Sequence, residues 1–361
     1  MKPPKLLVFH QLNDFSGSPK ILLLLLSGLS KRNKNIHLFT TKGGCLDELD
    51  KEFKRSYFRY NFSNNAFVTL AKSFGAQIMM LFYGLRHGSK SSVFFINTIM
   101  PVGGAVAAKL LGARCIYHYH ENAFAKNLYY QIKAYIMCLL ADEIICVSKY
   151  QSNSLKRKRG VYIIPNALQD NVRSRLHEHT DSALNHKNIV FVTSLKKYKG
   201  VTTFFKIAER LSEYEFTLVV NATDEDIELY LKAELIHITN NVSIFSRQKD
   251  VTPFYNKASI ALNLTDPKYA VETFGMTALE AMAAGVPVIV PNIGGIADLV
   301  KDGVNGYTVD PTNIDDVCTA ITKIFNDEQK YRQMSCNALT YAQQFDESKF
   351  IKSFESLIYH E

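Results

Sequence analysis

The stretch from Tyr269 to Pro311 sets the tightest limits on how this chain can fold. Thr273 is a good helix N-cap, and the residues after it predict a helix that ends near Ala284, because Gly285 and the proline that follows stop it. The apolar run Val288–Val290 then predicts a buried parallel strand. Helix, tight turn and buried strand in this order are typical of α/β folds.

Glycines in the same stretch predict helix N-termini that could bind an anion. Gly275 leaves the backbone open near the start of the first helix, and the pair Gly294–Gly295 is expected to open a second helix. Backbone N–H groups at helix N-termini bind phosphate and pyrophosphate. Glu272 stands before the first helix and Glu280 lies within it, and carboxylates accept strongly from hydroxyls. A diphosphate with hydroxyls on both sides is a nucleotide sugar.

These residues resemble a family signature. The run E-T-F-G-M-T-A-L-E at 272–280, followed by A-M-A-A-G-V-P-V-I and a Gly-Gly pair, is similar to the E-x7-E motif of family 4 retaining glycosyltransferases. The resemblance implies the GT-B fold, in which two Rossmann-like doubly wound domains face one another across a cleft. It also implies that Glu272 holds the donor sugar and Glu280 the ribose. The donor-binding residues implied in this stretch are Glu272, Phe274, Gly275, Met276, Thr277 and Glu280.

Chain length and element order also predict two domains. At 361 residues the chain is long for one core, and short apolar strands alternate with helices throughout. The run VYIIPN at 161–166 resembles the exit from the first domain in this family. We therefore expect an acceptor-binding domain over residues 1–167 and a nucleotide-sugar-binding domain over residues 168–346, entered through a polar loop at 169–187. The resemblance implies that a last helix, within 347–361, packs back onto the first domain.

Three candidate site residues in the first domain follow predicted strands. Gly17 lies in the loop after the strand Lys5–His10, at the edge where open α/β sheets bind ligands, and is a candidate for donor binding. Asn97 ends a later strand and is a candidate for binding acceptor hydroxyls. His120 follows the next strand, and the resemblance implies that it polarises or positions the sugar or the acceptor.

The resemblance further implies two cations that bind the donor diphosphate, and here the sequence departs from the family. Family members typically carry an Arg followed five residues later by a Lys. Lys199 matches the Lys, but Ser194 stands at the Arg position. Lys196 could supply a second positive charge, although a lysine cannot reproduce the bidentate hydrogen bonds of an arginine. Arg247, after a later predicted strand, corresponds to a position near the nucleotide base.

Positive charge is concentrated in the first half of the chain. Residues 1–165 contain 23 Lys and Arg against 8 Asp and Glu, whereas residues 166–361 contain 19 against 26. Because no nucleic-acid-binding motif is found, we expect the basic domain to contact an anionic membrane surface or a phosphate-bearing acceptor. No Asp-x-Asp metal site stands in the expected place, so neither a metal nor another cofactor is expected. The six cysteines show no CxxC pair or metal-ligand spacing and are interpreted as reduced core thiols.

Together these features predict a retaining glycosyltransferase that moves a sugar from a nucleotide-diphosphate donor to a saccharide or lipid-linked saccharide. Glu272, Lys199 and His120 are the candidate catalytic residues. The expected location is the cytoplasm, at the inner face of the cell membrane, and the family setting is bacterial surface polysaccharide or lipopolysaccharide assembly. Two alternatives stay open: a nucleotide-sugar epimerase of the same fold, and a non-catalytic partner subunit, which Ser194 favours.

Overall fold

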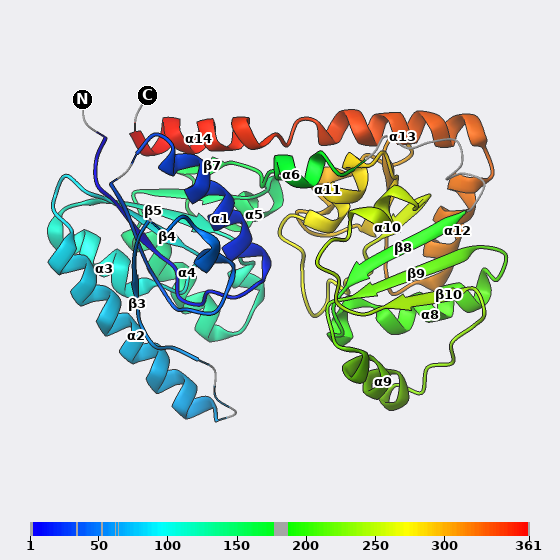
Figure 1. Cartoon of the computed structure of the whole chain (residues 1–361), viewed down its shortest axis with the longest axis horizontal. Helices are drawn as coiled ribbons and strands as arrows, with labels where there is room; N and C mark the ends of the chain where they lie inside the picture. The colour runs from blue at the N-terminus through cyan, green and yellow to red at the C-terminus, as the bar shows by residue number, and fades with distance from the viewer. Residues whose placement is uncertain are drawn as a thin grey trace. The chain divides into compact units, whose positions relative to one another are not determined.

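The computed structural model describes residues 3–33, 35–51, 53–61, 63, 65–176 and 187–359. The chain divides into two compact units, unit 1 with residues 1–167 and 347–361 and unit 2 with residues 168–346 (Figure 1). Residues 177–186 of the predicted loop at 169–187 lie outside the described residues. Each unit is a parallel sheet with helices packed against it, so the predicted class of two doubly wound α/β domains is confirmed.

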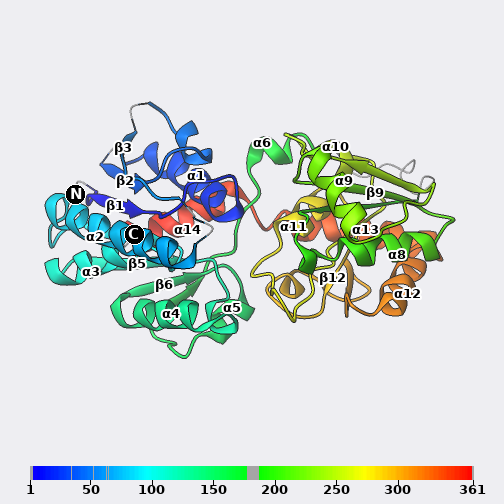
Figure 2. The same cartoon turned by 90° about the horizontal axis from the view of Figure 1, so that it is seen from below.

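Unit 1 contains a seven-stranded parallel sheet with the strand order β3-β2-β1-β4-β5-β6-β7. Its strands are β1 (Leu6–Phe9), β2 (Ile36–Thr40), β3 (Lys54–Tyr57), β4 (Val93–Asn97), β5 (Arg114–Tyr119), β6 (Glu143–Cys146) and β7 (Val161–Ile163). Its helices are α1 (Gly17–Ser30), α2 (Ala66–His87), α3 (Val102–Leu111), α4 (Leu128–Leu140), α5 (Lys149–Ser154) and α14 (Glu347–Tyr359), with 3-10 turns η1 (Cys45–Glu48) and η2 (Ala123–Ala125). Figure 2 shows these elements from a second direction.

Both faces of the unit 1 sheet are buried, as parallel strands require. All four residues of β1, Leu6–Phe9, are fully buried. One face carries the core shared with α2, α3 and α4. The other face is covered in part by α14, whose Phe354 ring lies 6.0 Å from the Phe95 ring. Arg114, at the start of β5, donates to the Leu357 carbonyl at 2.6 Å and so fixes the end of α14 to the sheet.

Unit 2 contains a six-stranded parallel sheet with the strand order β10-β9-β8-β11-β12-β13. Its strands are β8 (Asn188–Thr193), β9 (Glu215–Val220), β10 (Val242–Phe245), β11 (Ile260–Leu262), β12 (Val288–Pro291) and β13 (Gly306–Val309). Its helices are α6 (Asp170–Arg173), α8 (Val201–Arg210), α9 (Asp224–Ala233), α10 (Thr252–Asn256), α11 (Met276–Ala283), α12 (Ile314–Phe325) and α13 (Glu328–Ala342), with 3-10 turns η3 (Lys197–Lys199) and η4 (Ala297–Leu299).

In each sheet the strand order changes direction beside the first strand of the unit. β1 lies between β2 and β4, and β8 lies between β9 and β11. The chain leaves these neighbouring strands in opposite directions, which opens a crevice at the carboxyl edge where α/β sheets bind ligands. The fold therefore indicates two places for a site: the loops after β1 and β4 in unit 1, and the loops after β8 and β11 in unit 2.

Three local predictions are wrong. α11 begins at Met276 with Gly275 as its N-cap, rather than with Thr273, because the chain turns into the helix at Gly275 with φ of +102°. The pair Gly294–Gly295 does not open a helix, since only the three-residue turn η4 follows it. Among the cysteines, Cys336 is exposed and is therefore not a core thiol.

Candidate functional site

The carboxyl ends of β8 and β11 bring Lys199 and Glu272 together. Lys199 ends the turn η3 after β8, and Glu272 lies in the loop that leads from β11 to α11. Lys199 Nζ and Glu272 Oε1 form an ion pair, and each side chain is 23% exposed. Thr265 Oγ1 accepts from Lys199 Nζ at 3.4 Å and donates to Glu272 Oε1 at 3.0 Å. We call these three side chains the Lys199–Glu272–Thr265 cluster.

The two loops that carry the cluster are fastened to one another by their backbones. The Asp266 amide donates to the Tyr198 carbonyl at 2.8 Å. Gly200, which follows Lys199, adopts φ of +82°, and a Cβ there would clash with the Leu264 carbonyl oxygen. A glycine is therefore required where the β8 loop passes the β11 loop, and this close approach places the ammonium of Lys199 beside the carboxylate.

The glycine pair Gly294–Gly295 fixes the backbone of Glu272. The Gly295 amide donates to the Glu272 carbonyl oxygen at 2.8 Å. Gly294 adopts φ of +116°, and a Cβ there would lie 2.6 Å from the same carbonyl oxygen. The pair thus acts as a support for the carboxylate rather than as the anion-binding helix start that the sequence predicted.

The N-terminus of α11 lies directly after Glu272 in the chain. Within the described residues no side chain caps this helix, so its first amides are available to an anion. Met276 and Thr277 are half-buried in its first turn. Phe274 is buried, with its ring 5.7 Å from that of Phe345, so its side chain packs in unit 2 and only its backbone could meet a ligand.

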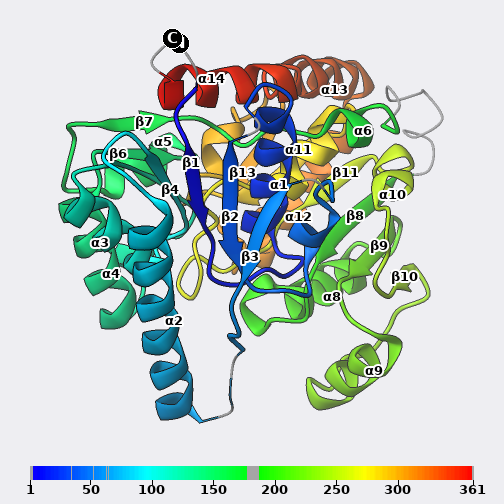
Figure 3. The ribbon, with the colours of Figure 1, turned by 60° about the vertical axis from the view of Figure 1, so that its left-hand side comes forward.

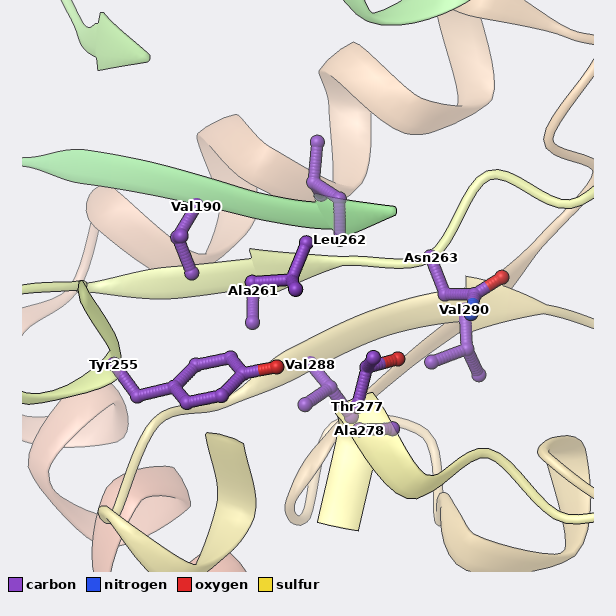
Figure 4. Close-up of a pocket in the computed structure, with 10 residues that line it drawn as sticks. Val190, Tyr255, Ala261, Leu262, Asn263, Thr277, Ala278, Val288 and Val290 are labelled. Atoms are coloured by element: carbon purple, nitrogen blue, oxygen red, sulfur yellow. The ribbon is translucent and has the colours of Figure 1, made fainter. Parts of the chain in front are cut away.

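Glu280 is held on α11 by a buried tyrosine. Tyr255 Oη donates to Glu280 Oε2 at 3.2 Å, and burial beside this carboxylate raises the pKa of the Tyr255 phenol. Figure 4 shows Tyr255 and Thr277 among apolar side chains of β8, β11 and β12, and the gap that they enclose is too small for a water molecule. α11 therefore packs closely against apolar side chains of the sheet. Its N-terminal turn and Glu280 are the parts that could contact a ligand.

Within the described residues, no side-chain hydrogen bond links the cluster to Arg247, Lys196 or Ser194. Arg247 follows β10, is exposed, and donates from Nε to Asn221 Oδ1 at 2.9 Å. Lys196 is exposed, with Nζ 6.0 Å from the ring centre of Tyr198, and Ser194 is half-buried after β8. Within the described part of the chain, neither Arg247 nor Lys196 forms a hydrogen bond or ion pair with the cluster. Lys199 is thus the cation that the structure places beside Glu272.

In unit 1 the carboxyl ends of β1, β4 and β5 gather Asn97 with three histidines. Asn97 Nδ2 donates to His10 Nδ1 at 3.1 Å. His120 Nε2 lies 3.1 Å from Asn97 Oδ1 and 3.1 Å from His118 Nδ1. With all three imidazoles neutral, a proton on His120 Nε2 is shared between Asn97 Oδ1 and His118 Nδ1, while Nε2 of His10 and Nε2 of His118 are buried without a partner among the described residues. Asn97 is buried and engaged on both sides, so it positions His120; His10 and His118 were not predicted.

Gly17 is the first residue of α1 and is exposed beside this network. Asn97 Nδ2 lies 3.5 Å from the carbonyl oxygen of Ser18, which places the start of α1 next to the end of β4. A Cβ at Gly17 would meet no atom within 4 Å, so packing does not require a glycine there. In the described ranges no group of three or more His, Cys, Asp or Glu side chains could hold a metal ion. The expectation that the protein needs no cofactor stays a prediction.

We expect the free energy of unfolding to fall as the pH is lowered from about 6.5 to about 4. Burial lowers the pKa of His10 to about 4, so the unfolded chain, in which a histidine titrates near its ordinary value, binds the proton first. Stability is fully present above the unfolded pKa and is lost as the pH falls toward the folded one, by about 3 kcal/mol for His10 alone. Urea unfolding at several pH values measures this slope.

His10→Gln should make that pH dependence shallower. His237→Gln is the matched control, because His237 is exposed in unit 2 and should leave the slope unchanged. An identical slope in wild type and His10→Gln would contradict the assignment of a neutral, buried His10.

Gly275→Ala should lower the free energy of unfolding by about 2 kcal/mol. A non-glycine residue at this positive φ costs about 1–2 kcal/mol, and a Cβ at Gly275 would in addition clash with Ile296. Gly17→Ala provides the control, because the added methyl group meets open space at the start of α1. Urea unfolding midpoints compare the two variants, and equal shifts would show that the left-handed turn into α11 does not matter.

Comparison with known proteins relates unit 2 to a family of enzymes. The family model "Glycosyl transferases group 1" matches residues 172–340, which is nearly the whole of unit 2. An uncharacterized glycosyltransferase of Methanocaldococcus jannaschii is 29% identical over 218 residues, which cover 58% of this chain and 57% of that protein. The capsular polysaccharide biosynthesis glycosyltransferase CapM of Staphylococcus aureus is 24% identical over 351 residues, which cover 89% of this chain and 88% of that protein.

A solved structure shares the fold over both units. HepE of Anabaena, determined in complex with UDP-glucose, matches with a TM-score of 0.77 and 18% sequence identity, covering 98% of each chain. At this identity the likeness shows the fold alone, and it agrees with the predicted GT-B class. The family model relates residues 172–340 of this chain to group 1 glycosyltransferases. The match spans little more than half of the length of the M. jannaschii relative.

Proposed function

We propose that this protein is a retaining glycosyltransferase of family 4, which transfers a sugar from a nucleotide-diphosphate sugar to a hydroxyl of a saccharide or lipid-linked saccharide. The observation that carries the proposal is the Lys199–Glu272–Thr265 cluster, which lies where the strand order changes direction in unit 2 and directly precedes the uncapped N-terminus of α11. The UDP-glucose bound to HepE supports the donor class. The role of CapM in capsular polysaccharide biosynthesis supports a saccharide product.

In the proposed reaction, the bond between the anomeric carbon of the donor and its phosphate oxygen breaks. The acceptor hydroxyl oxygen bonds to that carbon, the nucleoside diphosphate leaves with the bonding electrons, and the hydroxyl proton passes to an oxygen of the departing diphosphate. Negative charge grows on the leaving phosphate, so groups that stabilise this charge accelerate the step. Lys199 Nζ donates two of its three hydrogens to Glu272 and Thr265. The third hydrogen would bind the diphosphate, together with the backbone amides of Met276 and Thr277.

The carboxylates and the unit 1 network take the remaining roles in the proposal. Glu272 would accept from hydroxyls of the donor sugar, and Glu280 from hydroxyls of the ribose. His120, positioned by Asn97, would meet the sugar or the acceptor. Retention of the anomeric configuration rests on the resemblance to family 4, as do the cytoplasmic location and the role in surface polysaccharide or lipopolysaccharide assembly.

A second candidate function is a non-catalytic partner subunit. It is favoured by Ser194, which stands at the position of the expected arginine and leaves Lys199 as the cation in the cluster among the described residues. Such a subunit would retain the fold but would not turn over a donor. A third candidate, an epimerase, would bind the same donor but release no nucleotide, so it is distinguished by the reaction products rather than by binding.

Donor binding is tested by thermal unfolding in the presence of a panel of nucleotide sugars that includes UDP-glucose, and in the presence of UDP, ADP and GDP. We expect at least one of them to stabilise the protein by about 2.7 kcal/mol at a concentration 100 times its Kd. Lys199→Met should lose most of this stabilisation, whereas Lys206→Met, at an exposed position of α8, should keep it. If none of these compounds raises the unfolding temperature, the proposed donor class is wrong.

A further inference from the structure

Two helices of unit 1, α2 and α4, turn large apolar side chains outward. On α2, Phe67, Phe74 and Phe82 are 83%, 67% and 64% exposed, and they follow one another at helical spacing. On α4, Leu128, Ile132, Tyr135 and Leu139 are exposed at spacings of four, three and four residues, so they form a second stripe. The outer face of a helix in a soluble domain is normally polar. These two stripes therefore need a partner.

The two stripes lie on helices that cover the same face of the unit 1 sheet. α2, α3 and α4 contribute to the same core on one face of the unit 1 sheet, with α3 in contact with both of its neighbours. Ser73 Oγ on α2 lies 3.3 Å from Tyr129 Oη on α4, which joins the two outer helices directly. Figure 3 shows these helices together on one side of the sheet. We call the outward faces of α2 and α4 the α2–α4 surface.

The inner face of α2 is fixed within unit 1. Gln77 donates to Gln11 Oε1 at 2.9 Å and accepts from the Gly103 amide at 3.0 Å. Met80 is fully buried, and a Cβ at Gly84 would lie 2.5 Å from the Cβ of an alanine on α3. The segment 67–87 is long and apolar enough to cross a membrane by length and composition. Because its inner side is packed, it can instead lie flat at an interface with its outer side in contact with the apolar phase.

The charges around the α2–α4 surface have one sign. Residues 53–141 contain ten Lys and Arg and a single acidic residue, Glu121; of the ten, Lys133 is buried and Arg114 donates to α14 on the other face of the sheet. The Glu121 carboxylate accepts from the backbone amides of Ile99 and His120 at 3.3 Å, so it is engaged inside the unit. Lys72 and Arg86 are exposed on α2. The apolar stripes are thus bordered by positive charge with no exposed carboxylate from this part of the chain.

We propose that the α2–α4 surface docks unit 1 onto an anionic lipid surface, with both helices parallel to the membrane plane. Apolar side chains would enter the boundary between headgroups and acyl chains, and the surrounding lysines and arginines would bind lipid phosphates. A second copy of this chain is a poorer occupant, because it would bring like charges together. The inference does not depend on the proposed transferase activity, although it would bring the protein to a lipid-linked acceptor.

The experiment is sedimentation of the full chain with phosphatidylcholine vesicles that contain or lack phosphatidylglycerol. We expect binding to the anionic vesicles, weakening as salt is added, and little binding to the neutral ones. Phe74→Ser combined with Phe82→Ser, and separately Lys72→Glu combined with Arg86→Glu, should each weaken binding about tenfold or more. Circular dichroism and the donor-dependent rise in unfolding temperature check that these variants remain folded.

Matched controls come from unit 2. Leu229→Ser on α9 removes an equally exposed apolar side chain, and Lys206→Glu combined with Lys323→Glu reverses two exposed charges; both should leave vesicle binding unchanged. The proposal is overturned if the wild-type protein does not bind anionic vesicles, or if the α2 variants bind them as strongly as the wild-type protein does. It is also overturned if wild type is a dimer that Phe74→Ser with Phe82→Ser makes monomeric. Vesicle binding without donor binding would refute only the proposed function.

Discussion

Lys199→Met is expected to lower kcat for sugar transfer by about 100- to 1,000-fold and also to raise KM for the donor, because Lys199 contributes to donor binding as well. The reason for the lower kcat is that charge on the departing diphosphate develops in the transition state, and Lys199 is the cation that the structure places in the site of unit 2. Methionine keeps the length of the side chain and removes only the charge and its donors. Steady-state kinetics with the nucleotide sugar that stabilises the protein best measures the effect.

Three further variants separate the role of Lys199 from side effects. Lys206→Met changes an exposed lysine on α8 and should leave kcat unaltered. Lys196→Met tests the second predicted cation, which lies outside the cluster and should have a much weaker effect than Lys199. Removing Lys199 also leaves Glu272 without its ion-pair partner, so Lys199→Met combined with Glu272→Gln is needed. If the double variant recovers activity, the loss in the single variant came from the unpaired carboxylate and not from the missing cation.

Glu272→Gln is expected to lower kcat/KM by about 100-fold. A hydrogen bond to a charged group contributes about 1.5–3 kcal/mol, and the neutral amide would replace the carboxylate that we assign to the hydroxyls of the donor sugar. The amide oxygen can still accept from Thr265 Oγ1, as Oε1 does at 3.0 Å, so the fold should be retained. The measurement is kcat/KM with donor varied at a fixed acceptor concentration.

Variants of two other glutamates serve as comparisons for Glu272→Gln. Glu209→Gln changes an exposed carboxylate of α8 and should behave as wild type. Glu280→Gln should mainly raise KM for the donor, because ribose contacts are the same before and during the transfer step. Unchanged transfer in Glu272→Gln, or a larger loss in Glu280→Gln, would reverse the assignment of the two carboxylates.

The fold class could be predicted from the sequence because its signals are local. Short apolar strands, helix stops such as Gly285 and the Glu272–Glu280 motif each span a few residues. The pairing of Lys199 with Glu272 could not be predicted in the same way, since it depends on β8 and β11 being neighbours in the sheet. Sequence reasoning could place both residues at strand ends, but only the strand order brings them into contact.

The wrong predictions concern contacts between distant segments. Gly294–Gly295 has the local composition of a helix start, yet its conformation is set by the carbonyl of Glu272, which is distant in sequence. Thr273 has the better side chain for an N-cap, but only Gly275 tolerates the positive φ that the turn requires. The histidine network shows the same limit, because His10 and His118 become partners of Asn97 and His120 only when three strands assemble.

The exposure of α2 was likewise beyond sequence reasoning. An apolar helix of this length is compatible with a buried core element or with a membrane segment. Which side is buried depends on α3, whose glycine and alanine residues allow close packing against the inner face. The opposite side of α2 remains exposed, because no described element covers it.

The central claim is tested most directly by 1H NMR of the protein incubated with the nucleotide sugar that raises its unfolding temperature most, with and without a saccharide acceptor. We predict release of the nucleoside diphosphate and a new glycosidic product whose anomeric configuration is that of the donor. An epimerised sugar still attached to its nucleotide would contradict transfer and indicate the epimerase. An unchanged donor in the presence of each acceptor tested would instead identify a non-catalytic subunit.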